Sequence, residues 1–217
     1  MEITWYGHSC FRLAERGMAT VITDPFDARE VGYEPLKLKA DIVTVSHNAP
    51  GHNYVSAVKG NPYIITGPGE FEIGGVFITA IHTNGHLNHQ TDEINNILCL
   101  YDFNGINVVH LGAINRVPTQ TEVESLGPGH IALVSVGGGS GLNSAKASEV
   151  ISLLEPNIVI PMHFATPDSL IKLDPLSKFL KEMGLEEKIT RESTLKVTGV
   201  SSLSEETHVV VLDYFRG

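Results

Sequence analysis

Basic residues are scarce in this chain of 217 residues, which has 15 Lys and Arg against 25 Asp and Glu and a formal net charge of −10 at pH 7. Such a surface repels phosphate backbones, so the composition excludes a nucleic-acid partner. Long hydrophobic runs are missing as well, since no apolar stretch approaches the roughly 18 residues of a membrane-spanning helix. We therefore expect no membrane partner either.

Cysteine is also rare, because Cys10 and Cys99 are the two in the sequence. Both stand among apolar residues, a usage that suits a reducing compartment rather than a secreted protein held by disulfides. Residues 1–5 show neither the basic nor the apolar segment of a signal peptide. An apolar content of 42% is enough for a substantial core. We expect a cytoplasmic protein with one domain over residues 1–217.

Two common catalytic motifs are missing. No serine or cysteine stands in the G-x-S-x-G pattern that exposes a nucleophile. The Gly-Gly-Gly-Ser-Gly run at 137–141 lacks the Gly-Lys-Ser/Thr ending of a Walker motif. We interpret this run as a tight turn that lets two backbone segments approach closely.

The apolar pattern changes its character along the chain. The first half predicts strands at 3–6, 10–13, 19–23, 41–45, 63–65 and 76–81, then a hairpin of 98–103 with 106–111 around Asn104-Gly105. The second half alternates helices at 119–126, 144–154 and 175–183 with strands at 131–136, 158–161, 195–197 and 209–214. Thr119 and Glu122 have the spacing of a capping box. The order predicts an α/β protein with two packed sheets and helices outside.

The strand at 41–45 leads into Ser46-His47-Asn48-Ala49-Pro50-Gly51-His52-Asn53. Two histidines on a turn after a strand are typical of a metal site, because imidazole nitrogens are common ligands of Zn²⁺. Ala49 and Gly51, between them, carry no donor atom. The motif therefore indicates either a working metal site or the remains of one.

A series of sequence blocks in this order resembles the metallo-β-lactamase superfamily, and within it a compact bacterial branch of uncharacterised hydrolases related to ascorbate-lactone hydrolases. The blocks are Thr4-Trp5-Tyr6-Gly7-His8-Ser9-Cys10-Phe11, Thr23-Asp24-Pro25-Phe26, Gly67-Pro68-Gly69-Glu70-Phe71-Glu72-Ile73, His110-Leu111-Gly112 and Ile160-Pro161-Met162-His163-Phe164. The resemblance implies a four-layer αββα sandwich with its site at the sheet edges. It does not by itself imply activity.

The family motif H-x-H-x-D-H begins at His47 and ends at His52, and the last family histidine is His163. The resemblance places a further histidine near Gly85, next to His86. The family ligands that are replaced fall on Ala49, Gly51 and Ala113, the last being the position of the bridging aspartate. The acidic residue expected after the glycine run is Asn143.

These replacements argue against two metal ions. Two Zn²⁺ ions about 3.5–4 Å apart repel each other by about 20 kcal/mol even at an effective dielectric constant of about 20. Bridging anions normally offset this repulsion, and Ala113 and Gly51 supply none. We expect the dinuclear zinc centre to be lost.

Two kinds of chemistry remain open. His47, His52, His163 and His86 could together hold a single Zn²⁺ or another divalent transition metal such as Ni²⁺ or Cu²⁺. Alternatively, Asp24 and His8 are pocket candidates for a metal-free reaction, in which Asp24 orients a histidine that acts as a general base.

We therefore predict a metallo-β-lactamase-fold, hydrolase-like protein whose remaining activity is weak and uses one metal ion or none. The competing hypothesis is a non-catalytic protein that uses the inherited pocket to bind a small molecule or a partner. Esters, lactones and phosphodiesters all stay open as substrates, and so does assembly into a homo-oligomer.

Overall fold

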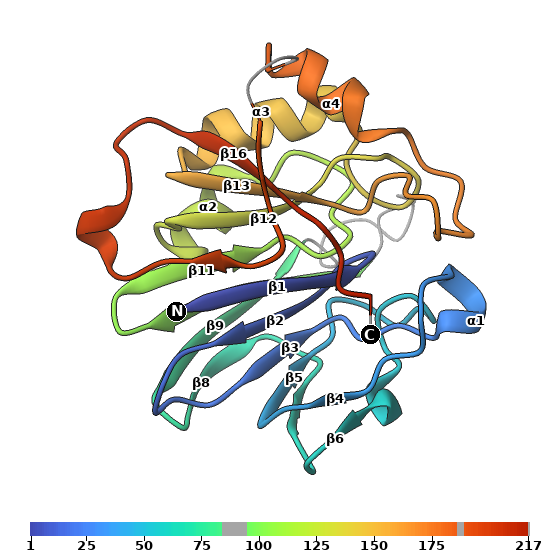
Figure 1. Cartoon of the computed structure of the whole chain (residues 1–217). Helices are drawn as coiled ribbons and strands as arrows, with labels where there is room; N and C mark the ends of the chain where they lie inside the picture. The colour runs from blue at the N-terminus through green and yellow to red at the C-terminus, as the bar shows by residue number, and fades with distance from the viewer. Residues whose placement is uncertain (84–94, 186–188, 217) are drawn as a thin grey trace.

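The computed structural model describes residues 1–83, 95–185 and 189–216, and two β-sheets packed face to face form its centre (Figure 1). The first sheet has the order β15-β1-β2-β3-β5-β7. Its strands are β1 (Glu2–Gly7), β2 (Cys10–Ala14), β3 (Val21–Thr23), β5 (Ile42–Thr44), β7 (Tyr63–Ile65) and β15 (Leu195–Lys196). Pairing is antiparallel from β15 to β3 and parallel from β3 to β7, so this sheet is mixed.

The second sheet has the order β14-β16-β13-β12-β11-β10-β9-β8. Its strands are β8 (Gly69–Ile73), β9 (Val76–Thr83), β10 (Asn96–Phe103), β11 (Ile106–His110), β12 (Ile131–Ser135), β13 (Ile158–Met162), β14 (Thr190–Glu192) and β16 (His208–Leu212). The hairpin of β10 and β11 is confirmed, because Asn104 and Gly105 take the positive φ angles, 54° and 86°, that a tight hairpin turn needs.

Helices cover the outer face of the second sheet in Figure 1. They are α2 (Gln120–Leu126), α3 (Ser144–Leu154) and α4 (Leu176–Glu182). The capping box of α2 is confirmed, with Thr119 and Glu122 bonding each other's backbone N–H groups. Together with the two mixed sheets, these helices confirm the predicted α/β metallo-β-lactamase fold.

The outer face of the first sheet has a thinner cover than the sequence predicts. Within the described residues, that layer consists of the short helix α1 (Ala28–Val31), the 3₁₀ turn Val55–Ala57 and a two-stranded sheet of β4 (Leu38–Lys39) and β6 (Val58–Lys59). Phe26, Val31 and Leu38 from this layer pack on Ile22 and Val43 of the sheet. Elements this short have no hydrophobic period to read, so the sequence patterns did not predict them.

The sheet geometry brings distant parts of the chain to one edge. Because β3 and β5 are parallel neighbours with Thr23 paired to Thr44, Asp24 and Ser46 leave the sheet close together. The turn between β1 and β2 reaches the same place, since the His163 N–H donates to the carbonyl of His8 over 3.1 Å. In the part of the chain that the structure describes, no helix has the length and hydropathy needed to cross a membrane.

One buried hydrogen bond joins the two sheets, between Thr44 Oγ1 on β5 and Tyr101 Oη on β10, 2.6 Å apart. We expect Tyr101→Phe and Thr44→Val each to lower the free energy of unfolding by about 1–2 kcal/mol, because each removes a hydrogen-bond partner from a buried hydroxyl. The double variant, which leaves neither hydroxyl, should lose clearly less than the sum. Urea unfolding measures this cycle, and strictly additive losses would contradict the prediction.

Candidate functional site

Asp24 is the buried anchor of the site, with 1% of its surface exposed. Its Oδ1 accepts the Ser46 backbone N–H over 2.7 Å. Its Oδ2 accepts the Ser46 hydroxyl over 2.6 Å and lies 2.7 Å from His52 Nδ1. Burial acts to raise the pKa of Asp24, but His52 and the Ser46 hydroxyl outweigh it and lower that pKa to about 2. The carboxylate is therefore ionised at neutral pH and acts only as an acceptor.

This carboxylate sets the tautomers of two histidines. His52 donates its Nδ1–H to Asp24, which leaves the lone pair of a neutral His52 on Nε2. Ser46 donates its one hydroxyl hydrogen to Asp24. Its oxygen can therefore only accept from His47 Nδ1, 3.1 Å away. His47 therefore also keeps its lone pair on Nε2. A carboxylate behind an imidazole is the arrangement that typically orients a metal-ligating histidine.

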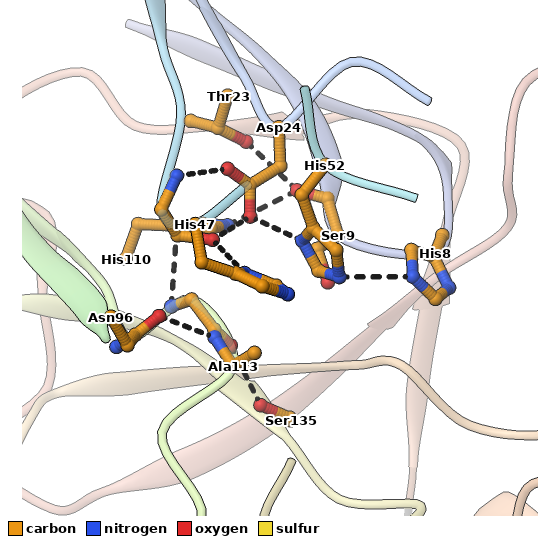
Figure 2. Close-up of polar contacts among 12 residues, drawn as sticks. His8, Ser9, Thr23, Asp24, His47, His52, Asn96, His110, Ala113 and Ser135 are labelled. Atoms are coloured by element: carbon orange, nitrogen blue, oxygen red, sulfur yellow. Dashed lines mark hydrogen bonds and ion pairs between the residues drawn. The ribbon is translucent and has the colours of Figure 1, made fainter. Parts of the chain in front are cut away.

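His8 reaches the same place from the turn between β1 and β2, as Figure 2 shows. Its Nε2 lies 3.2 Å from His52 Nε2. Because that His52 nitrogen holds a lone pair, His8 Nε2–H is the donor in this contact. His8 Nδ1 is then a lone-pair nitrogen, and it is buried without a hydrogen-bond partner among the described residues.

His163 follows β13 and is wrapped by the glycine run at 137–141. A Cβ on Gly137 would lie 2.4 Å from the His163 carbonyl oxygen, and one on Gly141 would lie 3.4 Å from His163 Nδ1. The run therefore permits a close backbone approach, as its interpretation as a tight turn predicts. His163 Nδ1 is also buried, and it has no hydrogen-bond partner in the part of the chain that the structure describes.

Donor nitrogens of His8, His52 and His163 all lie within 4.8 Å of one another. Two nitrogens bound about 2.05 Å from one tetrahedral Zn²⁺ lie about 3.3 Å apart, close to the 3.2 Å between His8 Nε2 and His52 Nε2. Ligation through both of these atoms would require His8 to carry its proton on Nδ1 instead, and the hydrogen bond between the two rings would be lost. The residues present therefore fit one metal ion.

The protonation of the imidazoles suits the same role. Burial, and then the neighbouring imidazoles, hold the pKa of His8 well below its usual value and lower the pKa of His163 to about 3. Burial and then His52 lower the pKa of His47 to about 4. His8, His47 and His163 are therefore neutral at pH 7, and the neutral imidazole is the form that binds metals.

The other predicted site residues are placed differently. His47 lies beside the three-histidine group, with its ring centroid 4.1 Å from that of His52. The Ala113 N–H donates to Asn96 Oδ1 over 2.8 Å, so this backbone is occupied in the fold. Asn143 accepts the Lys146 N–H as the N-cap of α3. His86 lies outside the described residues.

Sequence reasoning did not include His8 among the metal donors. Two signals bear on its position: Gly7 before it, with a φ of 104°, and Gly51, whose missing side chain leaves room for an imidazole. A comparison of this sequence with the family motif scores Gly51 as a lost ligand. It does not detect a donor that a different turn of the chain brings to the same place. A buried three-histidine group is present, so loss of the metal site does not follow from the replaced residues.

A cavity of about 350 Å³ lies beside His47, and its described lining does not include His8, His52 or His163. His47 forms part of its wall, with Asn48 and Asn53 from the same loop and Val55 and Ile97 as apolar lining. Its size suits a small molecule.

The two mixed sheets and the covering helices together define a metallo-β-lactamase fold, with a buried three-histidine group at the sheet edge. A family model described as a beta-lactamase superfamily domain matches residues 2–163. A solved Thermotoga maritima structure, described as that of a candidate Zn-dependent hydrolase of the metallo-β-lactamase superfamily, is 35% identical. The match covers 97% of both chains with a TM-score of 0.78. The chain belongs to the metallo-β-lactamase superfamily.

More distant relatives agree with this assignment. A UPF0173 metal-dependent hydrolase of Thermoplasma acidophilum is 25% identical over 199 residues, covering 81% of this chain and 88% of the relative. A UPF0173 protein of Pyrococcus furiosus is 26% identical, covering 84% and 90%. An isothiocyanate hydrolase from Delia radicum gut bacteria, 15% identical with a TM-score of 0.67, covers 92% of this chain and all of its own, and shares the fold.

We expect Asp24→Asn to change the tautomer of His52. The amide has only one oxygen, so either its NH₂ group faces His52 Nδ1, or one of the three groups that donate to the carboxylate loses its acceptor. Asn tolerates the positive φ of 39° at this position. ¹⁵N–¹H NMR of the imidazoles should show His52 moving from Nδ1–H to Nε2–H. The free energy of unfolding should fall by about 2–4 kcal/mol.

Asp41→Asn is the matched control, because Asp41 is exposed and accepts the Thr20 N–H. It should leave the His52 resonances unchanged. If His52 keeps its Nδ1–H in Asp24→Asn, the carboxylate does not set this tautomer.

Proposed function

We propose that this protein is a hydrolase that works with one metal ion held by His8, His52 and His163. The observation that carries the proposal is the convergence of three buried imidazoles, two of which have an Nδ1 without a hydrogen-bond partner within residues 1–83, 95–185 and 189–216. Names of relatives, such as the metal-dependent hydrolase of T. acidophilum, support metal dependence. When bound, such an ion supplies Lewis-acid activation of a substrate oxygen and of water.

One ion fits this site better than two. Ala113 brings no bridging carboxylate, and its backbone N–H is already bonded to Asn96. Gly51 brings no side chain. Without anions between them, two divalent ions about 4 Å apart would repel each other by about 20 kcal/mol at an effective dielectric constant of about 20. A set of three imidazoles suits a single Zn²⁺, Ni²⁺ or Cu²⁺.

His47 is proposed as the proton acceptor of the reaction. It lines the 350 Å³ cavity, so a small substrate bound there would meet its ring. The Ser46 oxygen accepts from its Nδ1, which leaves the Nε2 lone pair free to take a proton from water or from a substrate hydroxyl. Asp24 orients His52 directly through Oδ2 and orients His47 through the Ser46 hydroxyl.

Protein purified without chelators should contain about one equivalent of a divalent transition metal. His163→Ala removes a buried donor, and its metal content should fall below about a tenth of an equivalent. Elemental analysis measures both. His208→Ala, which removes an exposed histidine far along the sheet, is the control and should keep the wild-type content. Two equivalents, or none, in the wild-type protein would contradict the proposal.

We expect His47→Ala to lower kcat about 100-fold, since a positioned proton acceptor typically contributes that much or more. Its metal content should stay near that of the wild type. The assay uses carboxylic esters, lactones and phosphodiesters as substrate classes. Asn48→Ala, in the same cavity wall, is the control and should change KM more than kcat.

The same measurements separate the alternatives. If His47→Ala loses its metal, His47 is a ligand rather than the proton acceptor. If the wild-type protein holds metal yet turns over none of the three substrate classes, a non-catalytic role in ligand binding is favoured.

A further inference from the structure

The cavity beside His47 combines carboxamide groups with apolar side chains. Its lining includes three asparagines, Asn48, Asn53 and Asn95. Val55 and Ile97 add apolar surface. A carboxamide both donates and accepts hydrogen bonds. The cavity therefore suits a ligand that has an apolar part and neutral polar groups.

The described part of this wall holds no charged side chain. Among the lining residues that the structure describes there is no Lys, Arg, Asp or Glu. The sequence that joins two of them, His82 and Asn95, contains no Lys or Arg either. His47, as the proposed proton acceptor, enters the reaction uncharged. A carboxylate bound here would lose its hydration without gaining a cationic partner, which is costly.

Asn48 and Asn53 are bonded to each other in the cavity wall. Asn53 Nδ2–H donates to Asn48 Oδ1 over 2.5 Å. Among the described contacts, this bond leaves Asn48 Nδ2 as a donor and Asn53 Oδ1 as an acceptor for a ligand. A hydroxyl or amide group can use both atoms. A carboxylate only accepts, so it has no hydrogen to share with the Asn53 oxygen.

Resting on the proposed function, we propose that the substrate is an uncharged carboxylic ester or lactone, and that its non-reacting part lies in this cavity. The Asn48–Asn53 pair bonds its polar groups, and Val55 and Ile97 contact its apolar part. His47 stands in the same wall, with its ring centroid 4.1 Å from that of His52. An acyl group bound here therefore lies beside the proposed metal site.

Hydrolysis of such a substrate needs water as the only other reactant. The oxygen of a water molecule bonds to the acyl carbon while His47 Nε2 takes one proton of that water. The bond between the acyl carbon and the alcohol oxygen then breaks, and the alcohol oxygen takes the proton from His47. The products are a carboxylic acid and an alcohol, joined in one molecule when the substrate is a lactone.

Two esters that differ only at one end test the preference for an uncharged substrate. They are 4-nitrophenyl hexanoate and mono-4-nitrophenyl adipate, which carries a carboxylate in place of the terminal methyl group. We expect kcat/KM of the purified protein to be at least about tenfold higher for the hexanoate, because the adipate brings an unpaired charge into the cavity. Rates are measured in roughly 1 M salt, where a Debye length of about 3 Å screens the long-range effect of the protein's net charge.

Asn48→Lys and Thr66→Lys place a cation in the cavity wall from two different segments of the chain. Each should raise kcat/KM for the adipate ester about tenfold, because the ammonium group pairs with the carboxylate. Ser201→Lys adds the same charge at an exposed residue outside the described lining, and it is the matched control. It should leave the ratio of the two rates unchanged. If neither cavity variant raises the adipate rate, the inference is wrong.

Binding of amides that resist cleavage gives a readout besides activity. Hexanamide and the monoamide of adipic acid match the two esters in length and charge. The methyl resonances of Val55 and Ile97 report on the cavity in ¹H–¹³C NMR spectra. Hexanamide should shift these resonances and bind at least about tenfold more tightly than the monoamide.

Three further results would overturn the inference while leaving the proposed function intact. The first is an equal kcat/KM for the two esters. The second is hydrolysis of the hexanoate without any shift of the Val55 and Ile97 resonances by hexanamide, which would place the substrate elsewhere. The third is hydrolysis of a phosphodiester but of neither ester. A protein that hydrolyses no ester, lactone or phosphodiester would instead overturn the proposed function, and with it this substrate class.

Discussion

The site depends on one buried carboxylate. Asp24 accepts the Ser46 N–H, the Ser46 hydroxyl and His52 Nδ1–H, and so joins the chain after β3 to the loop after β5. Removing a carboxylate from water is costly unless charge-assisted hydrogen bonds replace its hydration, and three short ones do so here. Because this group only accepts, it decides which nitrogen of His52 and of His47 carries the proton. In the neutral form of each ring, the lone pair therefore lies on Nε2.

Strain gathers around this carboxylate. His8, Asp24 and His163 all take positive φ angles, 51°, 39° and 52°. Each such conformation costs about 1–2 kcal/mol for a residue with a Cβ, and such costs persist where the surrounding structure fixes the backbone. Here the bonds of Asp24 and the link from His163 N–H to the His8 carbonyl fix it. The strain directs three side chains to one point, which regular strands alone could not do.

Much of the fold could be predicted from local patterns, and much of the site could not. The bounds of α3, the capping box of Thr119 and the Asn104-Gly105 turn follow from rules that involve a few neighbouring residues. The prediction that Asp24 orients a histidine comes from the resemblance to the family rather than from a local pattern. The donor role proposed for His8 depends on a contact between residues 44 positions apart, which no local pattern contains. Asn143 was compared with an acidic ligand, but in the structure it caps a helix.

The replaced residues are not equivalent once their surroundings are known. At Gly51, an imidazole from another turn stands against the backbone, 2.8 Å from where a Cβ would be. At Ala113, the neighbouring polar group is Asn96, which is already committed to the Ala113 N–H and the Leu111 carbonyl. An imidazole therefore lies close to the position that a side chain of residue 51 would occupy. At Ala113, the nearby polar group already has its hydrogen-bond partners within the fold. Three imidazoles, one of them bonded to the Asp24 carboxylate, can offset part of the charge of a single divalent ion. They place no anion between two ions to offset the repulsion between them. Counting lost ligands along the sequence predicts an empty site, whereas counting donors in space predicts a site for one ion.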